Sequence, residues 1–500
     1  MKKIALTEPL TEQARAAAEL LERLAFDWAL LDQLPADVRE KLHKAVAGLM
    51  DPNHRARRRR AKAQAREDRA QTRHRQDAVL NETGIRTLRR RPLVTTPNVF
   101  PPEHFQEQTS AGAADTDTGS AGERHCYVCK SKYSQLHAFY DQLCPKCGDD
   151  NLAARTELAD LRGRVALLTG GRVKIGYHAG LKLLRSGAHL IVTTRFPRNA
   201  AARYAEEPDF ADWAHRLEIF GLDLRHTPSV EAFCKDLVSS RARLDFIINN
   251  ACQTVRRPPD FYAHMMAAET AALRDMPAHV RALLGDGDSD RSAASLPALS
   301  SVAVSSAALS MVPLLPDELM SRPDLFPEGR LDADRQQVDL RGMNSWRMLL
   351  ADVPTVEFLE VQLVNAIAPF IFNARLKPLM LRVPGRDKHI VNVSAVEGQF
   401  YRIAKTTRHP HTNMAKAALN MMTRTAATDY YNDGIHMNSV DTGWITDEQP
   451  NGARAPGREL ALPLDAVDGA ARICDPVFRS ALGEFVGFGQ FLKDYRPVAW

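Results

Sequence analysis

The chain has 500 residues, of which 44% are hydrophobic and 25% are charged, and its formal net charge is +5. This length predicts two or three structural units, and this composition excludes a disordered or fibrous protein. The small net charge excludes a strongly basic chain, so any contact with nucleic acid would depend on a local cluster of charge.

The sequence also lacks the patterns of membrane insertion and export. It has no run of about 18 apolar residues, so we expect no membrane span. The N-terminal segment has two lysines but no apolar core, which is unlike a secretory signal. Four of the seven cysteines occur in CxxC pairs, which is typical of metal binding in a reducing compartment. We therefore predict a cytoplasmic protein.

The first predicted elements are helices. Apolar residues follow helical spacing within residues 9–50, and Pro35 predicts a break before a second helix that ends near Met50. Residues 51–80 contain ten Arg or Lys and four Asp or Glu, and the run RARRRRAKAQAREDRAQTRHR has only alanine as an apolar residue. No face of this helix could dock on a core. Three interpretations remain open for it: a nucleic-acid contact, a protein-docking arm and a solvated helix.

A small cysteine-rich module is predicted at residues 125–150. A helical region at 1–91 and a Pro-, Thr-, Ser- and Gly-rich linker at 92–124 precede it. Its pairs CYVC and CPKC comprise Cys126, Cys129, Cys144 and Cys147. Each pair can place two thiolates on one turn, and two such turns close a tetrahedral Zn²⁺ site. Four protein ligands leave no open position, so the predicted zinc is structural; two redox-active pairs are the alternative, but no βαβ unit surrounds them.

Short β-branched runs alternate with helical segments from residue 161 onward. The six runs lie at 165–169, 189–194, 217–223, 245–249, 389–394 and 435–440. Continuous apolar runs separated by helices indicate a parallel sheet that is covered on both faces. We therefore predict an α/β fold, a Rossmann-like doubly wound sheet over residues 161–500. The long interval between the fourth and fifth runs predicts an insertion at about 257–345.

The first run leads directly into a glycine-rich turn. TGGRVKIG (169–176) opens a helix, whose backbone N–H groups could hold a pyrophosphate. Gly170, Gly171 and Gly176 would allow the tight turn and the close approach of a ligand. Further landmarks follow in the order Asp223, NNA at 249–251, Asn365, Lys416 and VDTGWIT at 440–446.

With these landmarks, residues from about 161 to 446, and weakly to the end of the chain, resemble the short-chain dehydrogenase/reductase family. The family's TGxxxGxG motif matches at Thr169, Gly170 and Gly176, and Lys174 replaces its middle glycine. The family's NNAG matches at 249–251, and Cys252 replaces its last glycine. The resemblance implies NAD(P) binding and a dimer or tetramer that pairs through the helices of Asn365 and Lys416.

The resemblance also indicates which residues contact the cofactor. They are Thr169, Gly170, Gly171, Arg172, Lys174, Ile175, Gly176, Arg195, Asp223, Leu224, Asn250, Ala251, Lys416 and Gly443. Arg195 ends the second run, where the adenosine ribose should lie. An arginine there suits the 2′-phosphate of NADP, whereas an acidic residue would suit NAD. Arg172 and Lys174 add positive charge, so we predict NADP rather than NAD.

The family's catalytic tetrad of Asn, Ser, Tyr and Lys is only half present. Asn365 and Lys416 fit it, but the serine position is Ala395 and the tyrosine position is Thr412. An aliphatic hydroxyl such as that of Thr412 is a far weaker acid than a phenol. Catalysis would therefore need another proton donor.

Three residues near these positions could replace the tyrosine. Tyr401 follows the fifth run, and His409 and His411 precede the lysine helix with imidazoles that titrate near neutral pH. Two hypotheses follow. One is an NADP(H)-dependent oxidoreductase that acts on a carbonyl, hydroxyl or enoyl substrate with an altered proton donor. The other is a redox-silent NAD(P)-binding protein whose zinc module and basic helix engage a protein or nucleic-acid partner.

Overall fold

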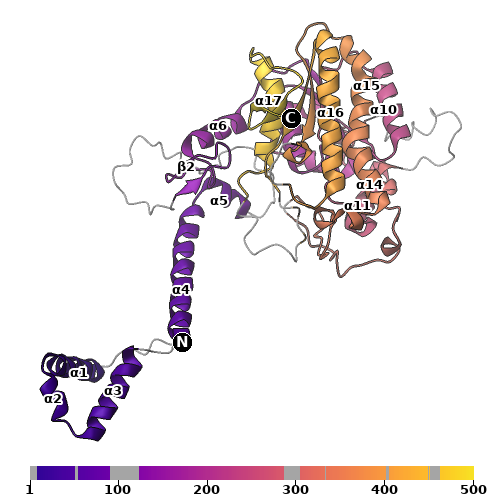
Figure 1. Ribbon diagram of the computed structural model, residues 1–500. Helices are drawn as coiled ribbons and strands as arrows, with labels where there is room; N and C mark the ends of the chain where they lie inside the picture. The colour runs from indigo at the N-terminus through magenta and orange to yellow at the C-terminus, as the bar shows by residue number, and fades with distance from the viewer. Residues whose placement is uncertain are drawn as a thin grey trace. The chain divides into compact units, whose positions relative to one another are not determined.

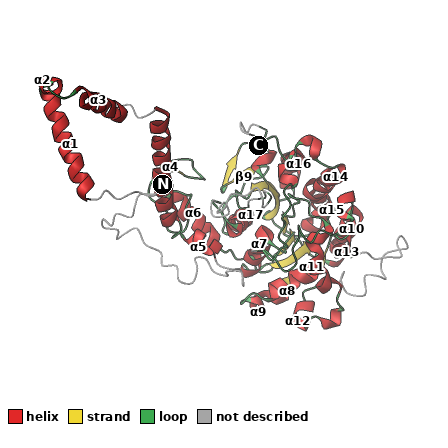
Figure 2. Cartoon of the chain, turned by 90° about the horizontal axis from the view of Figure 1, so that it is seen from below, coloured by secondary structure: helices red, strands yellow, loops and turns green. Residues whose placement is uncertain are grey.

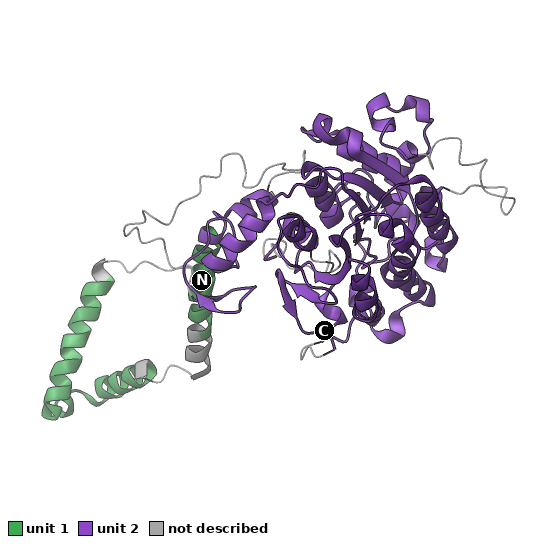
Figure 3. Cartoon of the chain, turned by 90° about the horizontal axis from the view of Figure 1, so that it is seen from above, with its two compact units in different colours: residues 1–78 green, residues 79–500 purple. Residues whose placement is uncertain are grey.

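The computed structural model describes residues 8–50, 54–90, 123–285, 305–332, 334–400, 405–446, 448, 450 and 462–500. The chain divides into two compact units, residues 1–78 and residues 79–500 (Figure 3). The short helix Gly84–Arg90 belongs to the second unit, where Ile85 packs with the cysteine module.

The first unit is helical, as predicted. Its elements are α1 (Glu8–Phe26), α2 (Trp28–Asp32), α3 (Ala36–Met50) and most of α4 (His54–Leu80). Asp27 caps α2 by accepting a hydrogen bond from the Ala29 N–H at 3.0 Å. Among the described side chains of this unit only Leu24 is a buried hydrophobic one, and Trp28 is 74% exposed. The described part of the unit therefore has almost no core of its own.

The second unit is built on an eight-stranded sheet with the order β10-β9-β8-β7-β6-β3-β4-β5. The strands are β3 (Val165–Thr169), β4 (His189–Thr194), β5 (Leu217–Gly221), β6 (Phe246–Asn249), β7 (Lys388–Ser394), β8 (Ile435–Asp441), β9 (Phe491–Lys493) and β10 (Arg496–Val498). All are parallel except β10, which pairs antiparallel with β9. The six predicted runs are confirmed as β3 to β8.

Helices cover both faces of this sheet (Figures 1 and 2). One face carries α7 (Lys174–Arg185), α8 (Pro197–Ala205) and α17 (Ala466–Ala481), and the other carries α10 (Thr227–Ser240), α15 (Ala368–Leu381) and α16 (Pro410–Asn432). In β3, Leu168 points into the first core and Leu167 into the second. A strand that is buried on both faces needs apolar residues at every position, which explains the continuous apolar runs. The predicted fold class is confirmed.

The remaining elements lie around this layered core. They are α5 (Gly84–Arg90), β1 (Arg124–His125), β2 (Lys132–Tyr133), α6 (Pro145–Thr156), α9 (Phe210–Trp213), α11 (Pro259–Thr270), α12 (Ala278–Arg281), α13 (Ser306–Leu309) and α14 (Thr355–Gln362). The described part of the insertion packs against the sheet domain, because Phe261, Tyr262 and Phe326 form a small core with Phe196 at the start of α8.

One segment of the described chain, Thr355–Leu381, is long and apolar enough to cross a membrane by length and composition alone. It comprises α14, the π-helical turn Leu363–Ile367 and α15. Within its most apolar window, 44% is buried inside the domain.

Candidate functional site

A cavity of about 440 Å³ lies at the carboxyl ends of β3, β4, β5 and β6. In open α/β sheets this is the edge at which ligands bind. The insertion contributes to the opposite wall through residues that include Tyr262, Gln336 and Asn344. Of the predicted cofactor residues, Gly170, Arg172, Lys174, Ile175, Gly176, Arg195, Asp223, Leu224, Asn250 and Ala251 line the cavity, whereas Thr169, Gly171, Lys416 and Gly443 do not.

The glycine turn that leads into α7 (169–176) tolerates no side chain at Gly176, in the first turn of the helix. A Cβ atom there would lie 2.2 Å from the Gly170 carbonyl oxygen and 2.4 Å from the Asn250 Nδ2 atom. Gly170 itself has a φ of +71°, a conformation that favours glycine. Asn250 Nδ2 donates to the carbonyl oxygens of Thr169 and Gly170 at 3.1 and 3.2 Å, which ties the turn to the end of β6. Among the described residues no side chain caps the first turn of α7, so its N–H groups could hold an anion.

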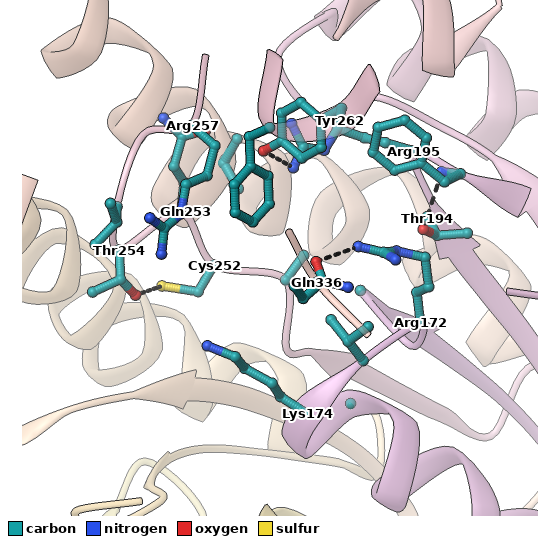
Figure 4. Close-up of a pocket in the computed structure, with 18 of the residues that line it drawn as sticks. Arg172, Lys174, Thr194, Arg195, Cys252, Gln253, Thr254, Arg257, Tyr262 and Gln336 are labelled. Carbon is teal, nitrogen blue, oxygen red and sulfur yellow. Dashed lines mark hydrogen bonds between the residues drawn. The ribbon is translucent and has the colours of Figure 1, made fainter. Parts of the chain in front are cut away.

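One end of the cavity is strongly basic (Figure 4). Arg195 donates to the Tyr262 hydroxyl at 2.7 Å, and its guanidinium lies 4.6 Å from the centre of the Tyr262 ring. Arg172 donates to Gln336 at 2.8 Å and to Asn199 at 2.9 Å. Burial, together with Arg195 and the nearby Arg203, lowers the pKa of Arg172 to about 10. Within the described residues, Arg172 and Arg195 form no ion pair with a carboxylate.

Lys174 occupies the position of the family motif's middle glycine and has a φ of +53°. Its ammonium group lies 3.2 Å from the Glu448 carboxylate, which also lines the cavity. Burial alone would raise the pKa of Glu448, but Lys174 and Arg257 outweigh it and hold the pKa at about 2. The segment after β8 is therefore attached to the glycine turn by an ion pair at the cavity wall.

A buried ionic network extends from Asp223 into the insertion. Arg225 donates to Asp223 at 2.6 Å and to Glu360 at 2.9 Å, and Arg256 binds the same Glu360 at 2.9 Å. Burial raises the pKa of Asp223, but Arg225 outweighs it and the net pKa is lowered. Arg256 also pairs with Glu318 in the insertion. The network therefore holds the insertion against the loops that follow β5 and β6.

Asn365 lies in the π-helical turn between α14 and α15 and is 1% exposed. Its Oδ1 atom accepts from the Gln253 N–H at 2.7 Å, and its Nδ2 atom donates to the Gln253 carbonyl at 3.1 Å. Both ends of the amide thus bind the loop that follows β6. Such π-turns within α-helices often occur at functional sites.

Lys416 and the loop that carries Ala395 are brought together. The Lys416 ammonium donates to the Val393 carbonyl at the end of β7, at 2.7 Å. A Cβ atom at Gly398, three residues after Ala395, would lie 2.8 Å from the backbone carbon of Lys416. Ser394 precedes Ala395, and its hydroxyl donates to Asn420 at 2.5 Å. That bond gives Ser394 a structural role, because it ties the end of β7 to α16.

The two histidines lie in different environments: His409 caps the start of α16, whereas His411 lies in its first turn rather than before the helix. His409 has a φ of +43°, and its ring is stacked on Trp346 with centroids 3.9 Å apart. Its Nδ1 atom lies 3.1 Å from Asn413 Oδ1, and burial lowers its pKa to about 4. His409 is therefore neutral at physiological pH and poorly suited to donate a proton.

His411 is paired with a buried carboxylate. Its Nε2 atom lies 3.3 Å from Glu357 Oε1, and the two side chains are 2% and 4% exposed. Burial would raise the pKa of Glu357, but His411 and Ser345 lower it. The neighbouring Thr412 hydroxyl is buried and has no hydrogen-bond partner among the described residues. Tyr401 lies outside the described residues.

The four paired cysteines form a cluster that could hold a metal ion. The sulfur atoms of Cys126, Cys129, Cys144 and Cys147 all lie within 4.8 Å of one another. The first pair lies in the turn between β1 and β2, and the second lies at the start of α6. A compact cluster of four thiol groups from two turns is the donor set that suits tetrahedral zinc.

Comparisons with known proteins match the sheet domain in two parts. The family model described as short chain dehydrogenase matches residues 164–271, and the model described as enoyl-(acyl carrier protein) reductase matches residues 341–462. An uncharacterized protein of Acanthamoeba polyphaga mimivirus is 30% identical over 370 residues, which is 71% of each chain. The chain belongs to the short-chain dehydrogenase/reductase family. The unmatched stretch between the two segments is most of the predicted insertion.

Other members of the short-chain family are similar over shorter stretches or only in fold. Dehydrogenase/reductase SDR family member 13 of Bos taurus is 36% identical over 106 residues, 20% of this chain and 28% of that protein. A short-chain dehydrogenase structure from Burkholderia cenocepacia in complex with NADP is 17% identical, with a TM-score of 0.41 over 67% of this chain and 97% of that one.

Several residues of this short-chain family site carry no signal in the sequence. Glu357 is one of two carboxylates in α14, and it meets His411 only through the packing of α14 on α16. Tyr262 and Gln336 belong to the insertion and reach the basic end from across the cavity. Glu448 follows the recognisable VDTGWIT segment, but nothing in its spacing indicates that it pairs with Lys174.

Proposed function

We propose that this protein is an NADP(H)-dependent oxidoreductase of carbonyl, hydroxyl or enoyl compounds in which His411 takes the role of the family's tyrosine. The observation that carries the proposal is the buried pair of His411 and Glu357. His411 lies one residue before the tyrosine position and on the same helix as Lys416, and Glu357 lies on α14.

The basic end of the cavity supports NADP over NAD. Arg172 is buried, and its described hydrogen-bond partners are uncharged. A buried guanidinium without a counter-ion is costly, and the cost falls when an anion binds beside it. The 2′-phosphate of NADP would supply that anion between Arg172 and Arg195, with charge-assisted hydrogen bonds. The glycine turn, which any Cβ at Gly176 would fill, suits the pyrophosphate of the same cofactor.

The histidine–glutamate pair supports the altered proton donor. A carboxylate beside one ring nitrogen can orient an imidazole, as in other acid–base sites. Glu357 remains ionised because its pKa is lowered. Neither ring nitrogen of His411 has a hydrogen-bond partner among the described residues, and Nε2 lies 3.3 Å from Glu357 Oε1, which leaves Nδ1 to exchange a proton in this proposal. NADPH, when bound, would supply the hydride.

The two altered tetrad positions carry small side chains, and neither supplies the acidic group that the family has there. Ala395 and Thr412 stand where the family has a serine and a tyrosine, and both side chains are smaller than those they replace. The Thr412 hydroxyl could still hydrogen-bond a substrate oxygen while His411 transfers the proton.

The test is NADPH consumption with a panel of aldehydes, ketones and enoyl thioesters. The wild-type protein should oxidise NADPH with at least one class. His411→Ala should lower kcat by about 10²- to 10⁴-fold, the usual contribution of a general acid, and leave the affinity for NADPH unchanged. His409→Ala removes a stacked, neutral imidazole of the same size and should have a much smaller effect on kcat.

Two results would contradict the proposal. If His409→Ala and His411→Ala lower kcat equally, His411 is not the proton donor. Tight NADPH binding without turnover of any compound in the panel would favour the redox-silent alternative.

We also propose that the cysteine cluster holds one structural Zn²⁺. All four donors come from the protein, which leaves no position open for a substrate. Elemental analysis should give about one zinc per chain, and Cys144→Ser should lower this ratio. Folded protein without zinc would contradict the proposal.

A further inference from the structure

The cysteine module is packed against the wall of the nucleotide cavity. Tyr127 lies between Cys126 and Cys129, in the first of the two cysteine pairs. Its phenol oxygen accepts a hydrogen bond from the Trp444 N–H at 2.8 Å. Trp444 belongs to the segment that follows β8, and this segment reaches the cavity two residues later at Thr446. A residue held between two metal ligands is thus bonded directly to the backbone that enters the nucleotide site.

A shared hydrophobic core connects the same two parts. Cys126, Phe139, Tyr140 and Leu143 pack in one cluster with Ile445, the residue after Trp444. Ile175 of the glycine turn packs against that cluster. Both Ile175 and the segment after Ile445 belong to the wall of the cavity. The core of the cysteine module therefore supports both the glycine turn and the segment after β8.

Charged groups reinforce this arrangement around the turn after β8. Asp441 Oδ1 accepts from the Gly443 N–H at 3.0 Å and from the Lys493 ammonium at 3.2 Å. The Lys493 ammonium lies 5.5 Å from the centre of the Tyr127 ring. Gly443 has a φ of +85°, which allows the sharp turn beneath the Tyr127 hydroxyl. The turn is therefore fixed on one side by Asp441 and on the other by Tyr127.

The cysteine module is also bound directly to the sheet domain, so its position fixes that of the residues it contacts there. Arg155 at the end of α6 donates to both oxygens of Asp465 at 2.7 Å, and the Tyr140 hydroxyl donates to Asp468 at 2.5 Å. These contacts attach the module to α17, which packs on α7 beside the cavity. A metal ion that orders the two cysteine turns would consequently order Tyr127 relative to the sheet domain.

From these contacts we propose that Tyr127 is a positioning residue of the nucleotide site. It holds segment 443–446 at the cavity wall, so that metal binding at the four cysteines and dinucleotide binding in the cavity favour each other. The predicted change in NADPH affinity rests on the proposed nucleotide binding. The positioning of the segment, in contrast, can be measured without any nucleotide.

The experiment compares two Tyr→Phe variants of the full-length protein. Tyr127→Phe keeps the ring and its packing but removes the oxygen that accepts from Trp444. Tyr133→Phe is the matched control, because Tyr133 lies in the same module and its hydroxyl donates to the Asp141 carbonyl at 3.3 Å within that module. Zinc content is measured for both variants, and it should equal that of the wild type.

Hydrogen–deuterium exchange of peptides that cover residues 441–446 is measured first, without nucleotide. Tyr127→Phe should speed exchange of these amides, and Tyr133→Phe should not. Removal of zinc from the wild type with a chelator should produce the same local increase. NADPH titration should then show an affinity about three- to tenfold weaker for Tyr127→Phe alone, the effect expected for one lost hydrogen bond.

If residues 441–446 exchange in Tyr127→Phe as slowly as in the wild type, the inference is overturned. It is also overturned if Tyr127→Phe and Tyr133→Phe change this exchange equally. Failure of the wild-type protein to bind NADPH would instead reject the proposed function, and the exchange comparison would still decide whether Tyr127 positions the segment. If Tyr127→Phe loses its zinc, the chelated wild type decides: unchanged exchange of the segment overturns the inference, and increased exchange supports it.

Discussion

At the scale of single residues, the site depends on close contacts that allow few alternatives. Gly176 lies within the glycine turn, where an added Cβ would meet backbone at 2.2 Å. The neighbouring motif glycine is replaced by Lys174, which keeps the left-handed conformation and pairs with Glu448. A side chain is therefore tolerated at one glycine position of the motif because it points to a partner, and it is excluded at the other.

We predict that Gly176→Ala lowers the free energy of unfolding by about 1–3 kcal/mol, because backbone rather than a flexible side chain must move. NADPH affinity should fall as the turn opens. Gly342→Ala is the control, since a Cβ there would meet nothing within 4 Å. Thermal unfolding and NADPH titration of both variants provide the measurement. Equal behaviour of the two would show that the turn is not held as described.

Some residues of the site could be predicted from the sequence and others could not. The motif glycines and Arg195 could be predicted because each occupies a position fixed by the adjoining strand. Glu357 could not, because its contact with His411 depends on two helices packing 54 residues apart in the chain. The sequence therefore indicates that a proton donor is missing, but only the fold brings together a candidate replacement.

At the scale of elements, α17 links the cysteine module to the sheet domain and contains an unusual carboxyl group. Burial raises the pKa of Asp475 to about 7, although Arg479 lies 4.0 Å away. In the unfolded chain this carboxyl ionises near its ordinary value of 3.8. Between about pH 4 and pH 7 the unfolded state therefore binds fewer protons than the native state, so this group lowers the stability as the pH rises.

Asp475→Asn should consequently stabilise the protein at pH 8 and have less effect at pH 5. The expected gain in the free energy of unfolding at pH 8 is roughly 1–4 kcal/mol relative to pH 5. Thermal unfolding at both pH values provides the measurement, with the exposed Asp150→Asn on α6 as the control. A gain that is the same at both pH values would contradict the assignment.

The elements differ in how well their sequences predict them. Strands β3 to β8 each lie in a short apolar run that can be recognised from the sequence. Strands β9 and β10 have three residues each, too few for a periodic signal, and they form because β8 offers an edge to pair with. The insertion could be located by its length, but its role in the wall of the cavity depends on long-range contacts such as that between Arg172 and Gln336.

At the scale of the whole molecule, the outer surfaces of α15 and α16 carry exposed apolar side chains. Phe370 is 57% exposed, Met414 is 50% exposed and Met421 is 55% exposed. Apolar groups gathered on neighbouring helices are typical of a contact between protein chains. The same two helices are those through which we expect the chain to self-associate as a dimer or tetramer.

We predict that the protein sediments as an oligomer at micromolar concentration and that Phe370→Glu combined with Met421→Glu converts it to monomer. At a two-fold interface the introduced glutamates of the two chains would be buried close together, and the repulsion between these like charges would be strongly unfavourable. Leu482→Glu, at another exposed apolar position, should leave the oligomer intact. Monomer in the wild type at this concentration would exclude the predicted interface.

The central claim is that the cavity at the carboxyl ends of β3 to β6 binds NADP, and the most direct measurement is the affinity of the purified protein for NADPH and NADH. Calorimetric titration should show NADPH binding more tightly than NADH. Arg195→Ala should remove most of this difference, because it weakens NADPH by the loss of a charge-assisted hydrogen bond, about 1.5–3 kcal/mol, and barely changes NADH. Absence of binding by both nucleotides would contradict the account.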